Sequence, residues 1–146
     1  MKNMLCTAAL LASTVLVAPA TMARDDLVQF DIQTAMEHGK EKQVLNDSIK
    51  MVFGEEHQLT PVQEFGEFTS NKKTNAFAKS DQTACNWAFL SAVKSLQERA
   101  VKSGGNAVIN IRSYYKKNDF RSATEFQCGA GTIMAGVTLV GDVVKL

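Results

Sequence analysis

The spacing of apolar residues predicts one long helix. Between residues 82 and 103 apolar side chains recur every three or four positions, and charged or amide side chains occupy the opposite side. Ser80 or Asp81 can cap the start of this helix, and Gly104-Gly105 supplies the left-handed residue that ends it. The predicted apolar face consists of Trp87, Leu90, Val93, Leu96, Ala100 and Val101.

Alternation of apolar and polar residues predicts about five strands around this helix. The predicted strands are 27–32, 49–53, 62–69, 106–115 and 120–128, followed by an extended stretch at 128–140 and an edge pairing at 143–146. Residues 34–38 can form a short helical turn, and the polar residues 70–80 and 116–119 are typical of turns. The pattern indicates an α+β fold of two layers, an antiparallel sheet with the helix on one face. Self-association would bury the other face of the sheet.

The first 23 residues have the layout of a secretory signal peptide. A short positive segment, Met1 to Asn3, precedes an uncharged run of about 14 residues, and small residues stand before a cleavage site at Arg24. A membrane-spanning helix needs roughly 20 apolar residues, so a retained anchor is the weaker alternative. We expect residues 24–146 to form a single periplasmic or secreted domain with no membrane span.

The cysteine count changes with this cleavage. Cys6 is lost with the leader, and Cys85 and Cys128 remain in an oxidising compartment, which predicts a disulfide between them. A metal site would need more ligands, and neither His38 nor His57 stands in a metal-binding motif. No neighbouring base would activate either cysteine as a nucleophile. We therefore predict no bound metal and no cofactor.

Charge and motifs exclude several functions. The chain has 16 basic and 15 acidic residues, and loss of Lys2 leaves 15 of each, which argues against nucleic acid as a partner. Gly131 and Gly136 have the spacing of a phosphate-binding loop, but Val137 stands where the loop needs lysine, so the chain is not expected to be an ATPase. No serine elbow or histidine-based triad is present in the sequence. We predict no catalytic residues.

Two basic stretches are the candidates for ligand binding. Arginine, tyrosine and lysine side chains can stack on and pair with an anionic or sugar-like ligand, although a strand running into a basic turn gives the same pattern. The first stretch contains Arg112, Tyr114, Tyr115, Lys116 and Lys117, and the second contains Asn71, Lys72 and Lys73.

The run LQERAVKSGGNAVINIRSYY, preceded by FGEFTSNKKTN, resembles the YbjQ-like family, whose members are named as heavy-metal-binding proteins. The resemblance covers about residues 65–146 and is most specific at 104–111. The whole chain is similar to small exported proteobacterial proteins labelled "excinuclease ATPase subunit", and the missing phosphate-loop lysine argues against that label. The resemblance implies an α+β fold and ring-like homo-oligomers, with a distant fold similarity to the RcsF stress-sensor lipoprotein. No cluster of soft metal ligands remains once the cysteines pair.

The sequence thus predicts an exported, disulfide-bonded, non-enzymatic domain that forms homo-oligomers and binds an envelope protein or a small ligand. One alternative is a metal or small-anion binder that uses His57, His38 or residues 112–117. Another alternative is a small hydrolase that uses carboxylates such as Glu67 and Glu125.

Overall fold

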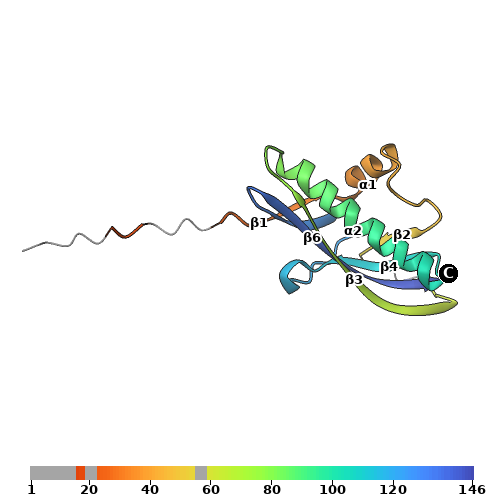
Figure 1. Ribbon diagram of the computed structural model, residues 1–146. Helices are drawn as coiled ribbons and strands as arrows, with labels where there is room; N and C mark the ends of the chain where they lie inside the picture. The colour runs from red at the N-terminus through yellow and green to blue at the C-terminus, as the bar shows by residue number, and fades with distance from the viewer. Residues whose placement is uncertain (1–15, 19–22, 55–58) are drawn as a thin grey trace, which may run out of the picture.

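The computed structural model describes residues 16–18, 23–54 and 59–146. Two helices and a curled sheet of six strands form an α+β fold, with the long helix lying across the sheet (Figure 1). The elements in chain order are β1 (Asp26–Asp31), α1 (Ile32–Glu41), β2 (Lys50–Phe53), β3 (Gln63–Asn75), α2 (Asp81–Ser103), β4 (Ala107–Ser113), the 3₁₀ turn η1 (Tyr115–Lys117), β5 (Glu125–Ala130) and β6 (Met134–Lys145).

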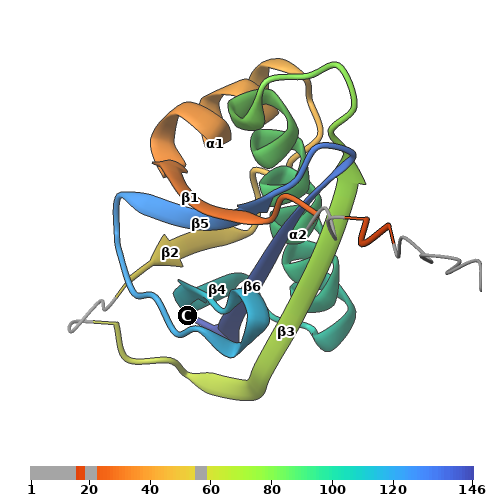
Figure 2. The ribbon, with the colours of Figure 1, turned by 90° about the vertical axis from the view of Figure 1, so that its left-hand side faces the viewer.

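Strand β6 is the centre of the sheet. β3 pairs with it along its whole length, from Asn75 opposite Met134 to Gln63 opposite Lys145. On its other edge β6 pairs first with β5 and then with β4, and β1 and β2 extend the sheet from those two strands. The β2–β4 pairing is parallel, so the sheet is mixed and the prediction of a purely antiparallel sheet is wrong. Figure 2 shows β3 along one side of the molecule and β1 with β5 above β4.

Helix α2 begins and ends where the sequence predicts it. The Ser80 side chain accepts a hydrogen bond from the amide of Thr83 (3.1 Å), which caps the first turn. Small residues face the sheet and let the helix approach it closely, and Phe89 stacks on Phe126 of β5 with ring centroids 4.2 Å apart. Val101 was predicted for the apolar face but is 55 % exposed. The fully buried residues of α2 include Ala84, Cys85, Ala88, Phe89, Ala92, Val93 and Ala100.

The two glycines after α2 serve different purposes. Gly104 has the left-handed backbone conformation (φ +84°) that ends the helix, as the sequence predicts for this pair. At Gly105 a Cβ atom would lie 2.7 Å from the carbonyl oxygen of Val144, so that glycine allows α2 to pass directly into the sheet. Gly105 is therefore needed for space and not for a positive φ.

Three other expectations need correction. Residues 32–41 form a full second helix, α1, whose start is capped by Asp31, where the sequence predicts only a short helical turn at 34–38. The strand predicted at 62–69 continues to Asn75, which places the predicted turn residues 71–75 in β3. The C-terminal residues 143–146 do not form an edge pairing, because β6 runs unbroken to Lys145 between β3 and β4. Pairing between distant strands determines the last two segments, whereas the local Asp31 cap stabilises the start of α1.

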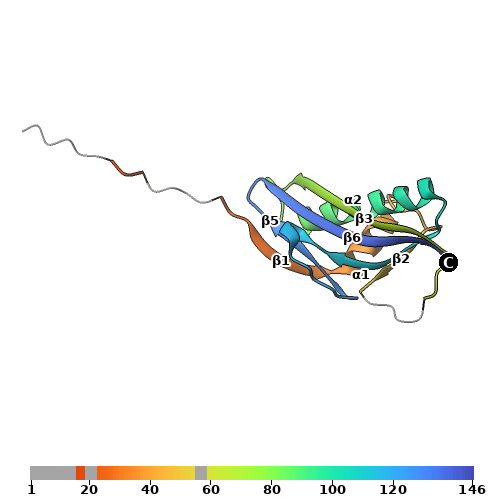
Figure 3. The same ribbon diagram turned by 90° about the horizontal axis from the view of Figure 1, so that it is seen from below.

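The two faces of β6 have different surroundings. Ala135, Val137 and Leu139 point into the core beneath α2, which Figure 3 shows lying along one side of β6 and β3. Alternation along the strand places Gly136 and Thr138 on the other face. Directly opposite residues on paired strands share a face, so Lys73 and Asn71 of β3 lie beside them. The open face of the sheet is thus polar near the start of β6.

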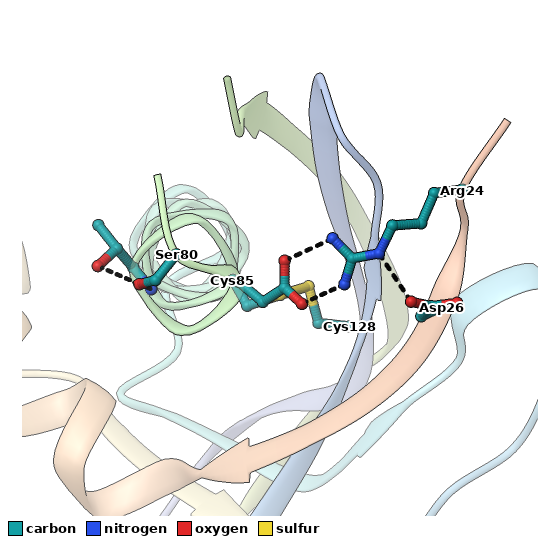
Figure 4. Close-up of polar contacts among 7 residues, drawn as sticks. Arg24, Asp26, Ser80, Cys85 and Cys128 are labelled. Atoms are coloured by element: carbon teal, nitrogen blue, oxygen red, sulfur yellow. Dashed lines mark hydrogen bonds and ion pairs between the residues drawn. A yellow bond between two sulfur atoms is a disulfide. The ribbon is translucent and has the colours of Figure 1, made fainter. Parts of the chain in front are cut away.

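The predicted disulfide joins Cys85 of α2 to Cys128 of β5 (Figure 4). Both cysteines are completely buried, and their Cα atoms are 5.9 Å apart. The bond closes a loop between residues 43 positions apart in the chain and ties the first turns of the helix to the outer half of the sheet. Near it, Arg24 forms ion pairs with Asp26 and Asp81 and so fixes the start of β1 to the start of α2.

We predict that Cys85→Ser and Cys128→Ser each lower the free energy of unfolding by about 4 kcal/mol, the chain-entropy value for a loop of this size. The double variant should be no less stable than either single variant, because one bond is lost in all three. Urea unfolding measures the effect, and reductant should destabilise only the wild type. Two thiols that are freely alkylated in native protein would show that the bond does not form.

Candidate binding site around Tyr115

The site lies beside the point on one edge of β6 where the neighbouring strand changes from β5 to β4. β5 pairs with Ala135 and Gly136, and β4 pairs from Leu139 onward. The chain leaves β4 between these two pairings, and there the amide of Tyr114 donates to the Thr138 carbonyl oxygen (2.8 Å). The turn η1 then folds over the open face of the sheet. The turn therefore lies next to the gap between β4 and β5.

Two consecutive lysines in this turn have a left-handed backbone. The φ angles of Lys116 and Lys117 are +49° and +64°, a region that non-glycine residues rarely adopt. The conformation costs roughly 1 kcal/mol per residue, so surrounding contacts must hold it. The amide of Asn118 donates to the Tyr115 carbonyl oxygen (2.9 Å), and the Asn118 side chain donates to Gln127 of β5 (2.9 Å). These bonds fix the turn against the sheet.

The ring of Tyr115 rests on two glycines. A Cβ atom at Gly129 would lie 2.1 Å from Cζ of this ring, and a Cβ atom at Gly136 would lie 3.2 Å from its Cε2. No other residue type leaves room for the ring at Gly129, which faces the open side of β5 while its neighbour Cys128 faces the core. The glycines therefore form the floor that positions the Tyr115 hydroxyl group.

The Tyr115 hydroxyl and the Lys116 ammonium converge on one carboxylate, that of Asp25. The hydroxyl donates to Oδ1 of Asp25 (2.9 Å), and Lys116 Nζ forms an ion pair with its Oδ2. Asp25 lies directly before β1, far from the turn in sequence. Two donors from the turn η1 thus bind a carboxylate from the segment before β1.

Asp25, Tyr115 and Lys116 shift one another's pKa values. The pKa of the Asp25 carboxyl is lowered by the hydrogen bond from Lys116 and then by that from Tyr115, with a further contribution from Lys73. The hydrogen bond between Lys116 and Asp25 also raises the pKa of Lys116. Burial raises the pKa of Tyr115, and the bond to Asp25 raises it further. Since Asp25 has a lower pKa in the folded chain, its contacts stabilise the fold above about pH 4 and lose that effect as the pH falls through the folded-state pKa.

A pocket of about 530 Å³, here called the Tyr115 pocket, opens beside this group. One side of it is basic and polar, and the hairpin between β5 and β6 supplies an apolar side. Lys73 of β3 also borders it, with its Cγ 3.5 Å from the position of a Cβ at Gly136. The pocket is lined by Ala23, Arg24, Asp25, Lys73, Tyr115, Lys116, Gly129, Gly131, Thr132, Ile133, Met134, Ala135 and Gly136.

The structure brings together only some of the residues that the sequence singled out. Tyr115 and Lys116 from the first stretch meet Lys73 from the second stretch in the Tyr115 pocket. Asn71 lies on the same face two positions before Lys73 in β3, whereas Lys72 is opposite Val137 and so lies on the helix side. The two stretches, 30 residues or more apart in the chain, are thus neighbours across β6.

The other residues of the first stretch have structural contacts. Arg112 forms ion pairs with Glu67 (3.2 Å) and Asp119 (3.3 Å), and only 13 % of its side chain is exposed. Its guanidinium also lies 5.9 Å from the ring centre of Tyr114. Lys117 is exposed on the outer side of the turn and does not line the Tyr115 pocket. Arg112 therefore anchors the turn to β3, and Lys117 lies apart from the pocket.

Among the residues that the structure describes, those considered for metal binding or hydrolysis do not form a metal site or a carboxylate pair. His57 lies outside the described residues, and the ring of His38 meets Trp87 edge-on with centroids 5.3 Å apart. Within residues 16–18, 23–54 and 59–146, no three His, Cys, Asp or Glu side chains are grouped as metal ligands. Glu67 is paired with Arg112, and Glu125 lies at the outer end of β5 opposite Asp31.

Sequence reasoning missed Asp25 and the glycine floor. Asp25 looked like one of two adjacent solvated carboxylates, and nothing local connects it to a turn 90 residues away. Gly129 and Gly136 were predicted only as part of an extended stretch at 128–140. The position of Gly129 gave a usable signal, because it directly follows Cys128, which was expected to form a disulfide, and alternation along a strand predicts that adjacent residues face opposite sides.

Comparisons of this chain with family models, curated proteins and solved structures gave no match. In the part of the chain that the structure describes, none of the helices combines the length and apolarity that crossing a membrane requires.

We predict strong coupling between Tyr115 and Gly129. Gly129→Ala should lower the free energy of unfolding by about 1–3 kcal/mol because its Cβ displaces the ring, and by much less in a Tyr115→Ala background. Gly136→Ala, which meets only the ring edge, is the matched control with a smaller effect. Urea unfolding of the four proteins gives the coupling energy. Additive effects of the two substitutions would contradict the packing of the ring on Gly129.

Proposed function

We propose that this chain is an exported, disulfide-bonded, non-enzymatic binding domain of the bacterial envelope, and that its ligand carries an anionic group held by Tyr115 and Lys116. One observation carries the proposal: the hydroxyl of Tyr115 and the ammonium of Lys116 converge on the carboxylate of Asp25 at the edge of the Tyr115 pocket. A turn held in a costly left-handed conformation presents both donors.

The composition of the pocket supports an anionic ligand. Lys73 adds a second ammonium group at its border, and the Tyr115 ring offers a flat surface for stacking. Arg112, which could have served the same purpose, is engaged with Glu67 and Asp119 and instead fixes the turn. A metal ligand is less well supported, because the described residues contain no group of donors for one.

The cysteines support export. If residues 1–23 are a signal peptide, Cys6 leaves with it and the two remaining cysteines are the pair that is bonded in the structure. A buried disulfide of this kind is typical of proteins that fold in an oxidising compartment. The proposed mature domain, residues 24–146, would then begin at Arg24, whose ion pairs with Asp26 and Asp81 hold the start of β1.

Self-association is part of the proposal. Two neighbouring loops expose apolar side chains at the same end of the sheet, because the amide of Ala76 donates to the Ile133 carbonyl oxygen (2.7 Å). Phe77 and Ile133 are 67 % and 64 % exposed, and Met134 is next to them. Burial of these side chains against a second copy would favour a homo-oligomer.

We predict that sodium phosphate or sodium acetate, added to protein purified from the envelope, shifts the amide NMR signals of Gly129 and Gly136, whereas sodium chloride at equal ionic strength does not. Lys116→Gln should weaken this binding about fivefold, the equivalent of an ion pair of about 1 kcal/mol. Lys117→Gln is the matched control, since it removes the same charge from the adjacent left-handed residue but lies outside the pocket. Equal losses in the two variants would refute a specific anion site.

A further inference from the structure

The anion-binding groups of the Tyr115 pocket are engaged by a residue of the chain itself. Asp25 accepts the hydrogen bond of Tyr115 and pairs with Lys116, so its carboxylate has the position that the proposed function gives to the ligand. Asp25 precedes the first paired residue of β1, Asp26 opposite Ala130, and has no strand pairing of its own. A short arm, Arg24 and Asp25, thus reaches the rim of the pocket.

The contacts that hold this arm are weak in water. The Lys116 side chain is 68 % exposed and that of Asp25 is 35 % exposed, and an ion pair with such exposure is weak because water screens it. Arg24 is held separately by Asp26 and Asp81, on the side of the arm toward α2. Asp25 can therefore leave Lys116 without loss of sheet pairing, of the disulfide or of core packing.

The pocket also indicates what kind of anion would replace Asp25. Beside the two donors, the β5–β6 hairpin contributes Ile133, Met134 and Ala135 to the lining. A carboxylate alone would use the donors only, whereas a carboxylate on an apolar or aromatic body would also cover these side chains and the Tyr115 ring. Burial of apolar area on these side chains would favour binding of such a ligand over a bare carboxylate.

We infer that Asp25 is a built-in competitor for the Tyr115 pocket, and that the ligand is a carboxylate attached to an apolar body, which displaces Asp25 from Tyr115 and Lys116. The inference rests on the proposed function and adds the class of ligand and the step that limits its binding. A site closed by its own arm for nine-tenths of the time binds about tenfold more weakly than the same site without the arm.

The test compares Asp25→Ala with Asp26→Ala in protein purified from the envelope. Both variants remove one negative charge from adjacent positions, but Asp25 contacts Tyr115 and Lys116 whereas Asp26 pairs with Arg24. Phenylacetate is the probe, phenylacetamide is its neutral counterpart, and binding is followed by NMR through the amides of Gly129 and Gly136. We expect Asp25→Ala to bind phenylacetate about tenfold more tightly than the wild type, Asp26→Ala to change little, and phenylacetamide to bind no variant.

Other results would overturn the inference. An equal gain in both variants would reveal a general effect of charge, and unchanged or weaker binding by Asp25→Ala would show that Asp25 does not compete. If the wild type binds anions through Lys116 but Asp25→Ala gains nothing, the proposed function stands and only the competitor role fails. If neither protein binds phenylacetate, phosphate or acetate, both proposals fail.

Discussion

One edge of β6 pairs with β5 near its start and with β4 further along, and the position of the Tyr115 pocket depends on this exchange of neighbouring strands. β5 and β4 both pair with that edge but at opposite ends, and the sheet curls because they diverge. The chain between them must leave β4 beside Thr138 and cross the open face, which places Tyr115 over β5 and β6. The other edge of β6 is fully paired with β3, and this pairing places Lys73 beside Gly136, which also lies under the Tyr115 ring.

Two adjacent residues of β5 connect the core with the open face. Cys128 points into the core and is bonded to Cys85 of α2, and Gly129 points the other way and supports the ring of Tyr115. The disulfide and the stacking of Phe89 on Phe126 thus fix the strand on which the pocket floor lies. Stability on the helix side and geometry on the open side therefore depend on the same short segment.

Local signals predicted the elements that local interactions determine. The helix at 82–103, a cap at Ser80 or Asp81 and the Cys85–Cys128 pair were all predictable, because they follow from periodicity, capping chemistry and cysteine count, and the structure has the cap at Ser80. The parallel β2–β4 pairing and the meeting of Lys73 with Tyr115 were not, since they depend on register between distant strands. Asp25 was missed for the same reason: its partners are 90 residues away and only the curl of the sheet brings them together.

The central claim is that a tyrosine hydroxyl and a lysine ammonium hold an anionic carboxylate at the open face. The most direct measurement is a pH titration of the Asp25 side-chain carboxyl by ¹³C NMR in the native protein. The account predicts a pKa below the ordinary aspartate value of 3.8, and a rise toward that value in Lys116→Gln. A pKa at or above 3.8 that the substitution leaves unchanged would contradict it.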